Sequence, residues 1–136
     1  MRKLVSLMIG SFLVAGAAAQ AAPKEDPQVR LERALEGRVA GEPVDCISMH
    51  NVKSSKIIDG TAILYETIGG TVYVNRPTNG AESLRRNDSL VTDTRSSRLC
   101  SIDVVRLYDS SARFQTGVVF LGDFVPYRRV RSAAAN

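Results

Sequence analysis

The chain has 136 residues, which is the length of one domain. Hydrophobic residues make up 44% of it and charged residues 24%, which argues against disorder over most of the length. Tryptophan is absent and aromatic residues are only 6%, which argues against an aromatic-lined binding groove.

Residues 1–21 have the pattern of a secretory signal peptide. Arg2 and Lys3 form a basic start, an apolar run follows, and Ala19-Gln20-Ala21 is a small-x-small cleavage site. A membrane anchor is the alternative, but the strongly apolar part is short for a spanning helix. Ala17 stands where a lipidated cysteine would have to be. We therefore predict a soluble periplasmic protein that is not a lipoprotein and has no transmembrane span after processing.

Processing changes the charge balance. The formal net charge of the full sequence is +4, and it falls to about +2 without Arg2 and Lys3. Export also removes the chain from the usual nucleic-acid compartments, so a nucleic-acid partner is not expected.

A short helix is predicted to begin at Asp26-Pro27, with Asp26 as the N-cap acceptor and Pro27 at the first helical position. Leu31 and Leu35 share one face, and Gly37 suits the position after the last turn. A helix of about three turns is too short to be stable alone in water. We expect it to cover an open edge or end of a sheet; docking on a partner is the alternative.

The segments after the helix carry loop and strand signals in turn. Arg38–Asp45 contains glycine and proline without periodicity, which predicts a loop. Cys46–Val52 alternates apolar and polar residues, which predicts a strand that pairs with the segments following it. Lys53–Lys56 is predicted to be a solvated turn.

Three antiparallel strands are predicted next, over Lys56–Ile58, Thr61–Ile68 and Thr71–Asn75. Asp59-Gly60 and Gly69-Gly70 separate them as two-residue hairpin turns. Neither face of the middle strand is wholly polar. We expect its Leu64 and Ile68 to point into the core and Glu66 to lie near a rim, although a register slip of one residue would invert the faces.

The last third of the chain is less regular. Ala81–Asp93 is predicted to be loop-rich with one or two short strands. Leu99–Tyr108 is predicted to be a single strand. Gly117–Val125 is the last apolar run, and Pro126 is expected to end it because proline has no N–H to donate.

Short strands, regular turns and one early helix predict a mainly β fold, a small antiparallel barrel or sandwich with a short N-terminal helix. There is no alternation of strands and helices that would indicate a parallel sheet. We expect a single β-rich domain over residues 22–130 and a disordered tail at 131–136.

Cys46 and Cys100 are the only two cysteines of the chain. Export into an oxidising compartment favours a disulfide between them. Such a bond would stabilise the fold by roughly 4 kcal/mol through the entropy of the loop it closes. Two free thiols, one of them catalytic, are the alternative, although neither cysteine lies in a C-x-x-C pair.

Residues that could carry chemistry are few. His50 is the only histidine, and together with Asp45 and Cys46 it suggests a metal site, but a strand would hold Cys46 and His50 too far apart for one ion. Asp59 and Asp103 could form a carboxylate pair for hydrolysis, but a turn at Asp59 and an edge or rim position for Asp103 explain them better. We predict no catalytic residue, no metal and no cofactor.

Two clusters of arginine are the only concentrations of charge, and their members are Arg85, Arg86, Arg128, Arg129 and Arg131. They form a candidate interaction patch for anionic envelope polymers or lipid headgroups. A solvated face without a partner is the alternative.

Several short segments of the chain follow an order that is typical of a known protein family. They are Cys46-Ile47, Ser55-Lys56-Ile57-Ile58-Asp59, Ile63-Leu64-Tyr65-Glu66, Gly69-Gly70-Thr71-Val72-Tyr73-Val74-Asn75-Arg76, Leu99-Cys100 and Leu121-Gly122-Asp123-Phe124-Val125-Pro126. Their order and spacing resemble a family of small exported proteobacterial proteins described only as a domain of unknown function. The resemblance covers about residues 37–128. It implies export and one compact domain, and it implies no activity, cofactor or catalytic residue.

The function expected from these features is non-enzymatic binding of another envelope component, either a protein or an anionic polymer. A small-ligand carrier with a pocket inside the barrel is the main alternative. A hydrolase that uses Asp59 or Asp103 is the third.

Overall fold

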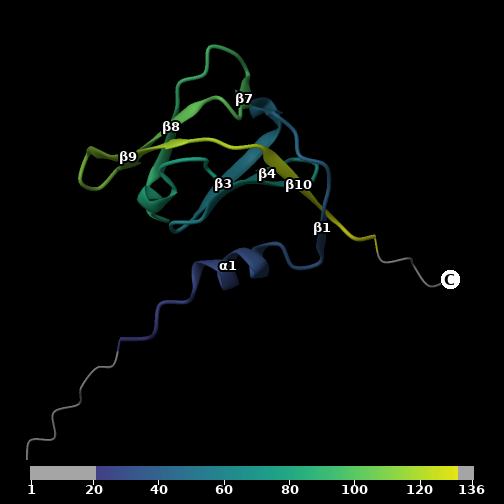
Figure 1. Cartoon of the computed structure of the whole chain (residues 1–136), viewed down its shortest axis with the longest axis horizontal. Helices are drawn as coiled ribbons and strands as arrows, with labels where there is room; N and C mark the ends of the chain where they lie inside the picture. Colours follow the sequence, from purple (N-terminus) through teal and green to yellow (C-terminus); the bar gives the residue numbers. More distant parts are fainter. Residues whose placement is uncertain (1–20, 132–136) are drawn as a thin grey trace, which may run out of the picture.

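The computed structural model describes residues 21–131 (Figure 1). Its elements are α1 Pro27–Ala34, β1 Arg38–Ala40, β2 Cys46–Ser48, the 3-10 helix η1 Met49–Asn51, β3 Val52–Ile58, β4 Ala62–Thr67, β5 Val72–Asn75, the 3-10 helix η2 Ala81–Ser83, β6 Ser89–Thr92, β7 Arg98–Cys100, β8 Val104–Asp109, β9 Phe114–Phe120 and β10 Phe124–Arg129. The predicted signal peptide, apart from its last residue, and the predicted tail beyond residue 131 lie outside the described residues.

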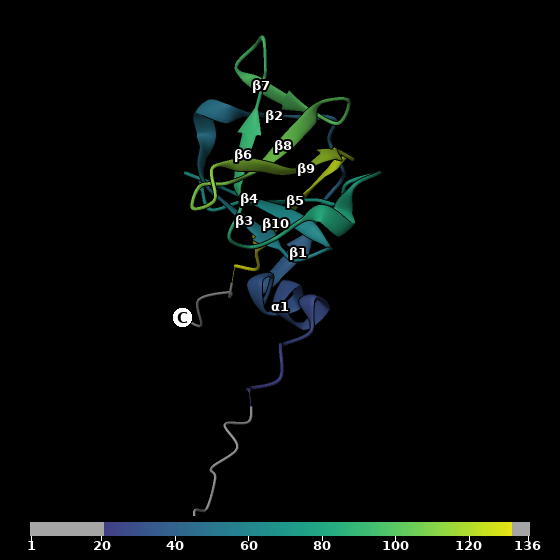
Figure 2. The same cartoon turned by 90° about the vertical axis from the view of Figure 1, so that its left-hand side faces the viewer.

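The strands pair antiparallel in three sheets. One has five strands in the order β1-β10-β5-β4-β3, one has three in the order β6-β8-β9, and β2 with β7 forms a short ribbon. Figure 2 shows α1, the five-stranded sheet and the three-stranded sheet stacked in that order. The mainly β, antiparallel prediction is confirmed: over residues 21–131 the sheets do not close into a barrel, and the arrangement fits a sandwich.

Strand β4, which lies between β5 and β3 in the larger sheet, is buried on both of its faces. Ile63 and Tyr65 belong to a core between the two larger sheets, whereas Ala62 and Leu64 belong to a second core under α1. Leu64 is therefore buried as expected. The prediction that Ile68 points into the core is wrong, because Ile68 lies in the turn after β4 and is 74% exposed.

Helix α1 begins as its sequence predicts. The backbone N–H of Gln28 donates to the side chain of the N-cap Asp26 at 2.7 Å, and Gly37 adopts a positive φ of 70° after the helix. Leu31 is only 1% exposed and packs into the second core. The helix thus covers a face of the five-stranded sheet and not an edge or end, because the second apolar face of β4 must be removed from water.

Three predictions for residues 38–56 are wrong. The expected loop Arg38–Asp45 contains β1, which pairs with β10. Cys46–Val52 is not one strand that pairs with the meander, because only β2 is extended and its partner is β7. Lys53–Lys56 is part of β3 and not a turn. It looked like a turn because β3 is the last strand of its sheet, so these side chains remain exposed.

The single strand predicted over Leu99–Tyr108 is broken into β7 and β8. The carboxylate of Asp103 accepts the backbone N–H of Cys100 at 2.7 Å, and the N–H of Asp103 donates to the carbonyl of Cys100 at 3.0 Å. This local pairing forms a tight turn that ends β7. The predicted disulfide is confirmed, because Cys46 and Cys100 lie opposite each other in the β2–β7 pair and are bonded.

Asn75, on β5, holds the connection that leads from β9 to β10. Its side chain is fully buried, and its Nδ2 donates to the carbonyl of Gly122 at 2.6 Å while its Oδ1 accepts the N–H of Gly122 at 3.1 Å. A Cβ on Gly122 would lie 2.5 Å from the carbonyl oxygen of Arg76, so only glycine allows this approach. The link fixes the connection between β9 and β10 against β5.

Pro126 lies inside β10 and does not end the strand, contrary to the prediction. Its carbonyl accepts the N–H of Gly41 at 2.7 Å, just beyond the end of β1. Proline is tolerated here because a strand residue directs its N–H and C=O to the same side, and β1 has ended at the position where an N–H would be needed.

Tyr65 provides a test of the main core. Its ring centroid lies 5.8 Å from that of Phe124, its hydroxyl has no hydrogen-bond partner among the described residues, and burial raises its pKa. We expect Tyr65→Phe to raise the free energy of unfolding by about 1 kcal/mol, because an unsatisfied buried hydroxyl is removed. The stability of the native chain should also fall above the ordinary tyrosine pKa of about 10, since only the unfolded chain can then ionise Tyr65.

Urea unfolding at neutral pH and at about pH 11 measures both effects. Tyr65→Phe should lose part of the alkaline decline, whereas Tyr108→Phe, on an exposed ring, should keep it in full. A Tyr65→Phe variant less stable than the native chain would show that the hydroxyl is hydrogen-bonded.

Candidate anion-binding cleft

The turn between β3 and β4 holds one carboxylate, that of Asp59, between two guanidinium groups. Its Oδ2 lies 2.9 Å from Nη1 of Arg30 and 3.3 Å from Nε of Arg86. Its Oδ1 accepts the backbone N–H of Arg86 at 2.6 Å. A single carboxylate thus links α1, the β3–β4 turn and the loop that precedes β6.

Backbone contacts hold this loop in place. The N–H of Gly60 donates to the carbonyl of Leu84 at 3.0 Å, and the buried side chain of Leu84 belongs to the main core. Gly60 has a φ of 61°, which this turn requires and glycine adopts freely. The N–H of Asp88 donates to the carbonyl of Arg85 at 3.0 Å and closes a second turn. Arg86 is therefore presented from a fixed loop.

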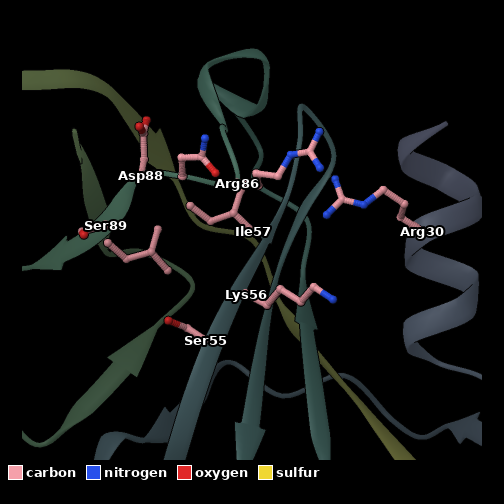
Figure 3. A pocket seen from close by; sticks show the side chains of 9 residues that line it. Arg30, Ser55, Lys56, Ile57, Arg86, Asp88 and Ser89 are labelled. Atoms are coloured by element: carbon pink, nitrogen blue, oxygen red, sulfur yellow. The ribbon is translucent and has the colours of Figure 1, made fainter. Parts of the chain in front are cut away.

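A cleft of about 560 Å³ opens beside these groups, between β3 and β6. Its lining residues are Arg30, Ser55, Lys56, Ile57, Arg86, Asn87, Asp88, Ser89 and Leu90. Figure 3 shows Arg30, Lys56 and Arg86 on its helix side and Asp88 and Ser89 on the opposite side. We call this hollow the β3–β6 cleft.

The β3–β6 cleft has an excess of positive charge. Three cationic side chains line it against one lining carboxylate, that of Asp88, which accepts a hydrogen bond from the hydroxyl of Thr116. The carboxylate of Asp59, which does not line the cleft, pairs with Arg30 and Arg86 and offsets one of the three positive charges. Each guanidinium carries five N–H donors, so Arg30 and Arg86 retain donors after binding Asp59. The cleft can therefore bind an anionic group by charge and hydrogen bonding together.

Cationic side chains continue from the cleft along α1, accompanied by the carboxylates of Glu66 and Glu25, the latter paired with Arg33. Lys56 also lines a hollow of about 310 Å³ together with Arg38 and Arg129. A further hollow of about 250 Å³ contains Lys56, Arg30 and Arg33. Lys56 is the residue common to all three hollows, so it lies at the centre of this cationic flank.

The arginines predicted as one patch fall into two places. Arg85 and Arg86 lie on the loop before β6 and line a hollow of about 730 Å³ that also contains Asp59. Arg128 and Arg129 lie on β10, where Arg129 is the register partner of Arg38. Arg131 is the last described residue and is exposed. Of the five, only Arg86 lines the β3–β6 cleft.

The residues considered for catalysis are not gathered at this cleft. Asp59 and Asp103 line different hollows; the carboxylate of Asp59 accepts the distant N–H of Arg86, and that of Asp103 accepts the N–H of Cys100 within a tight turn. His50 lies in η1, and the thiol of Cys46 is taken up by the disulfide. No group of three or more His, Cys, Asp or Glu side chains that could hold a metal ion occurs within residues 21–131.

Sequence reasoning missed two of the three cations in the cleft. The sequence predicts no role for Arg30, and it places Lys56 where a predicted turn meets the predicted strand Lys56–Ile58, without a part in any site. The signal that could have found them is Asp59, an acidic turn residue that needs a cationic partner when it is partly buried. The buried neighbour Leu31 fixes the direction of Arg30 only once α1 is known to lie on the sheet.

Comparison with known proteins yields no matching family model, no similar curated protein and no similar solved structure. The family resemblance drawn from the sequence therefore stays a prediction. In the part of the chain that the structure describes, no helix is long and apolar enough to cross a membrane.

Removing the carboxylate of Asp59 should loosen α1. In Asp59→Ala we expect faster amide exchange in α1 and in residues 85–88, because the contact that joins them to the turn is lost. The stability loss should be about 1 kcal/mol or less, since the side chains of Asp59 and Arg86 are 33% and 51% exposed. Hydrogen exchange by mass spectrometry measures the first effect. The exposed Asp123→Ala is the matched control, and equal exchange in the two variants would contradict the role of Asp59.

Proposed function

We propose that this chain is an exported, non-enzymatic domain that binds an anionic envelope component at the β3–β6 cleft. The observation that carries the proposal is the convergence of Arg30, Lys56 and Arg86 on one hollow. Asp59 balances only part of their charge. An anion that enters the cleft would gain charge-assisted hydrogen bonds from donors that already have a fixed position.

The lining of the cleft favours this function over a carrier of apolar ligands. Its volume of about 560 Å³ is in the range of small-molecule sites. Such sites are lined mostly by apolar side chains, whereas only Ile57 and Leu90 are apolar here, and Ile57 is buried. A polar, anionic ligand therefore suits the cleft better than an apolar one.

Export and periplasmic location are supported by two independent features. One is the basic-apolar-small pattern of residues 1–21. The other is the bond between Cys46 and Cys100, which is typical of oxidising compartments. A partner in the same compartment follows, and the cell envelope is rich in anionic polymers and proteins.

We expect Lys56→Glu/Arg86→Glu to weaken binding of the processed chain to poly-L-glutamate by at least about tenfold, because two of the three cleft cations are reversed. Binding of the native chain should weaken with added salt. Titration calorimetry at low and at physiological salt measures both effects.

Arg95→Glu/Arg113→Glu changes the net charge equally on exposed residues away from the cleft and is the matched control. An equal loss in both double variants would show that overall charge and not the cleft binds the polymer. Circular dichroism of both variants shows whether the fold is retained.

Expression of the full chain in a Gram-negative host tests export. We expect the periplasmic fraction to contain a chain that begins at Ala22 and resists alkylation until it is reduced. A chain that lacks residues 2–21 should stay in the cytoplasm with reactive thiols. Intact mass with and without reduction measures both properties, and an unprocessed, alkylatable full-length chain would contradict the proposal.

A further inference from the structure

The outer edge of β3 has no partner strand. β3 is the last strand of the five-stranded sheet, and β6, on the other side of the cleft, is the last strand of the three-stranded sheet. Within residues 21–131, the backbone of residues 53–57 forms no hydrogen bond to main chain beyond its pairing with β4. The β3–β6 cleft is thus the opening between two sheet edges.

The register shows which groups face this opening. The N–H of Thr67 donates to the carbonyl of Thr71 on the β5 side. Because the backbone N–H and C=O groups of successive strand residues point to opposite sides, those of Glu66 and Leu64 point towards β3. Their register partners Ser54 and Lys56 therefore face β4, and the intervening residues of β3 face away. The N–H and C=O groups of Ser55 and Ile57 are consequently directed at the cleft, which both residues line.

These free groups match the needs of an extended peptide. A strand added to β3 would pair with the backbone of Ser55 and Ile57, as in β-augmentation. Its side chains would alternate between two environments, because successive residues of a strand face opposite sides. One side holds Lys56 together with Arg30 and Arg86 (Figure 3), and the other holds Ile57 of the main core and Leu90, which packs against that core.

Charge decides what kind of strand the edge accepts. In an antiparallel pair with a second copy of this chain centred on Lys56, the two Lys56 side chains would lie opposite each other, and like charges in that position destabilise a strand pair. An acidic strand would instead place a carboxylate opposite Lys56 and form a favourable charge pair. We propose that the partner at the β3–β6 cleft is an extended protein segment in which acidic and apolar residues alternate, added as an antiparallel strand to β3. This inference rests on the proposed function and specifies its ligand.

The test uses an acetylated and amidated peptide of sequence Glu-Val-Glu-Val-Glu. We expect it to bind the processed chain at least about tenfold more tightly than the same composition in the order Glu-Glu-Glu-Val-Val. Methylation of both valine nitrogens, which would face β3 in an antiparallel pair, should weaken binding by a similar factor while the charge stays the same. Calorimetry measures the affinities, and hydrogen exchange should show slower exchange of the Ser55 and Ile57 amides in the complex.

The outcomes separate this inference from the proposed function. Equal binding of all three peptides, lost in Lys56→Glu/Arg86→Glu, would overturn strand addition and leave the anion site intact. Binding only to vesicles that contain phosphatidylglycerol would overturn the protein partner in favour of a lipid surface. Absence of binding to peptides, vesicles and poly-L-glutamate alike would overturn both proposals.

Discussion

Burial of β4 on both faces is the constraint on which the rest of the structure depends. Ile63 and Tyr65 require a cover on one side, and Ala62 and Leu64 require one on the other. The three-stranded sheet supplies the first cover and α1 the second (Figure 2). A helix of eight residues would not be stable alone, so its formation depends on this face of the sheet. The β3–β6 cleft arises because β3 and β6, the last strands of the two larger sheets, do not pair with each other.

Contacts away from the cleft hold the rest of the fold together. Asn75 fixes Gly122 and thereby the crossing from β9 to β10, while the disulfide joins β2 to β7. At the cleft itself Asp59 connects α1 to the loop that carries Arg86. A cationic group that is already oriented loses less entropy on binding than a free surface arginine. The fold therefore converts three dispersed sequence positions into one organised site.

Local sequence signals predicted what depends on a few neighbouring residues. The Asp26-Pro27 helix start, the reversal of the chain at Asp59-Gly60 and the Cys46–Cys100 bond are examples, since a cap, a turn signal and the cysteine count each specify them. The predicted two-residue length of that turn is wrong, because Ile58 pairs with Ala62 and three residues lie between them. Pairing between distant segments was not accessible in this way. The partner of β2 lies more than fifty residues later, and the polar edge strand β3 has the composition of a turn. The cleft was missed for the same reason, because Arg30, Lys56 and Arg86 meet only in the folded chain.

Charge and backbone have different parts in such a site. The cations are partly exposed, so their attraction for a ligand is screened over about 8 Å at physiological salt, and they act mainly by attracting anions and rejecting a second copy of β3. The N–H and C=O groups of Ser55 and Ile57 act only at hydrogen-bond distance and do not depend on salt in the same way. An acidic ligand without an extended backbone would use only the first contribution. A strand that carries acidic residues on the Lys56 side would use both, which is why the combination of an open edge and a one-sided charge favours a protein segment over a simple anion.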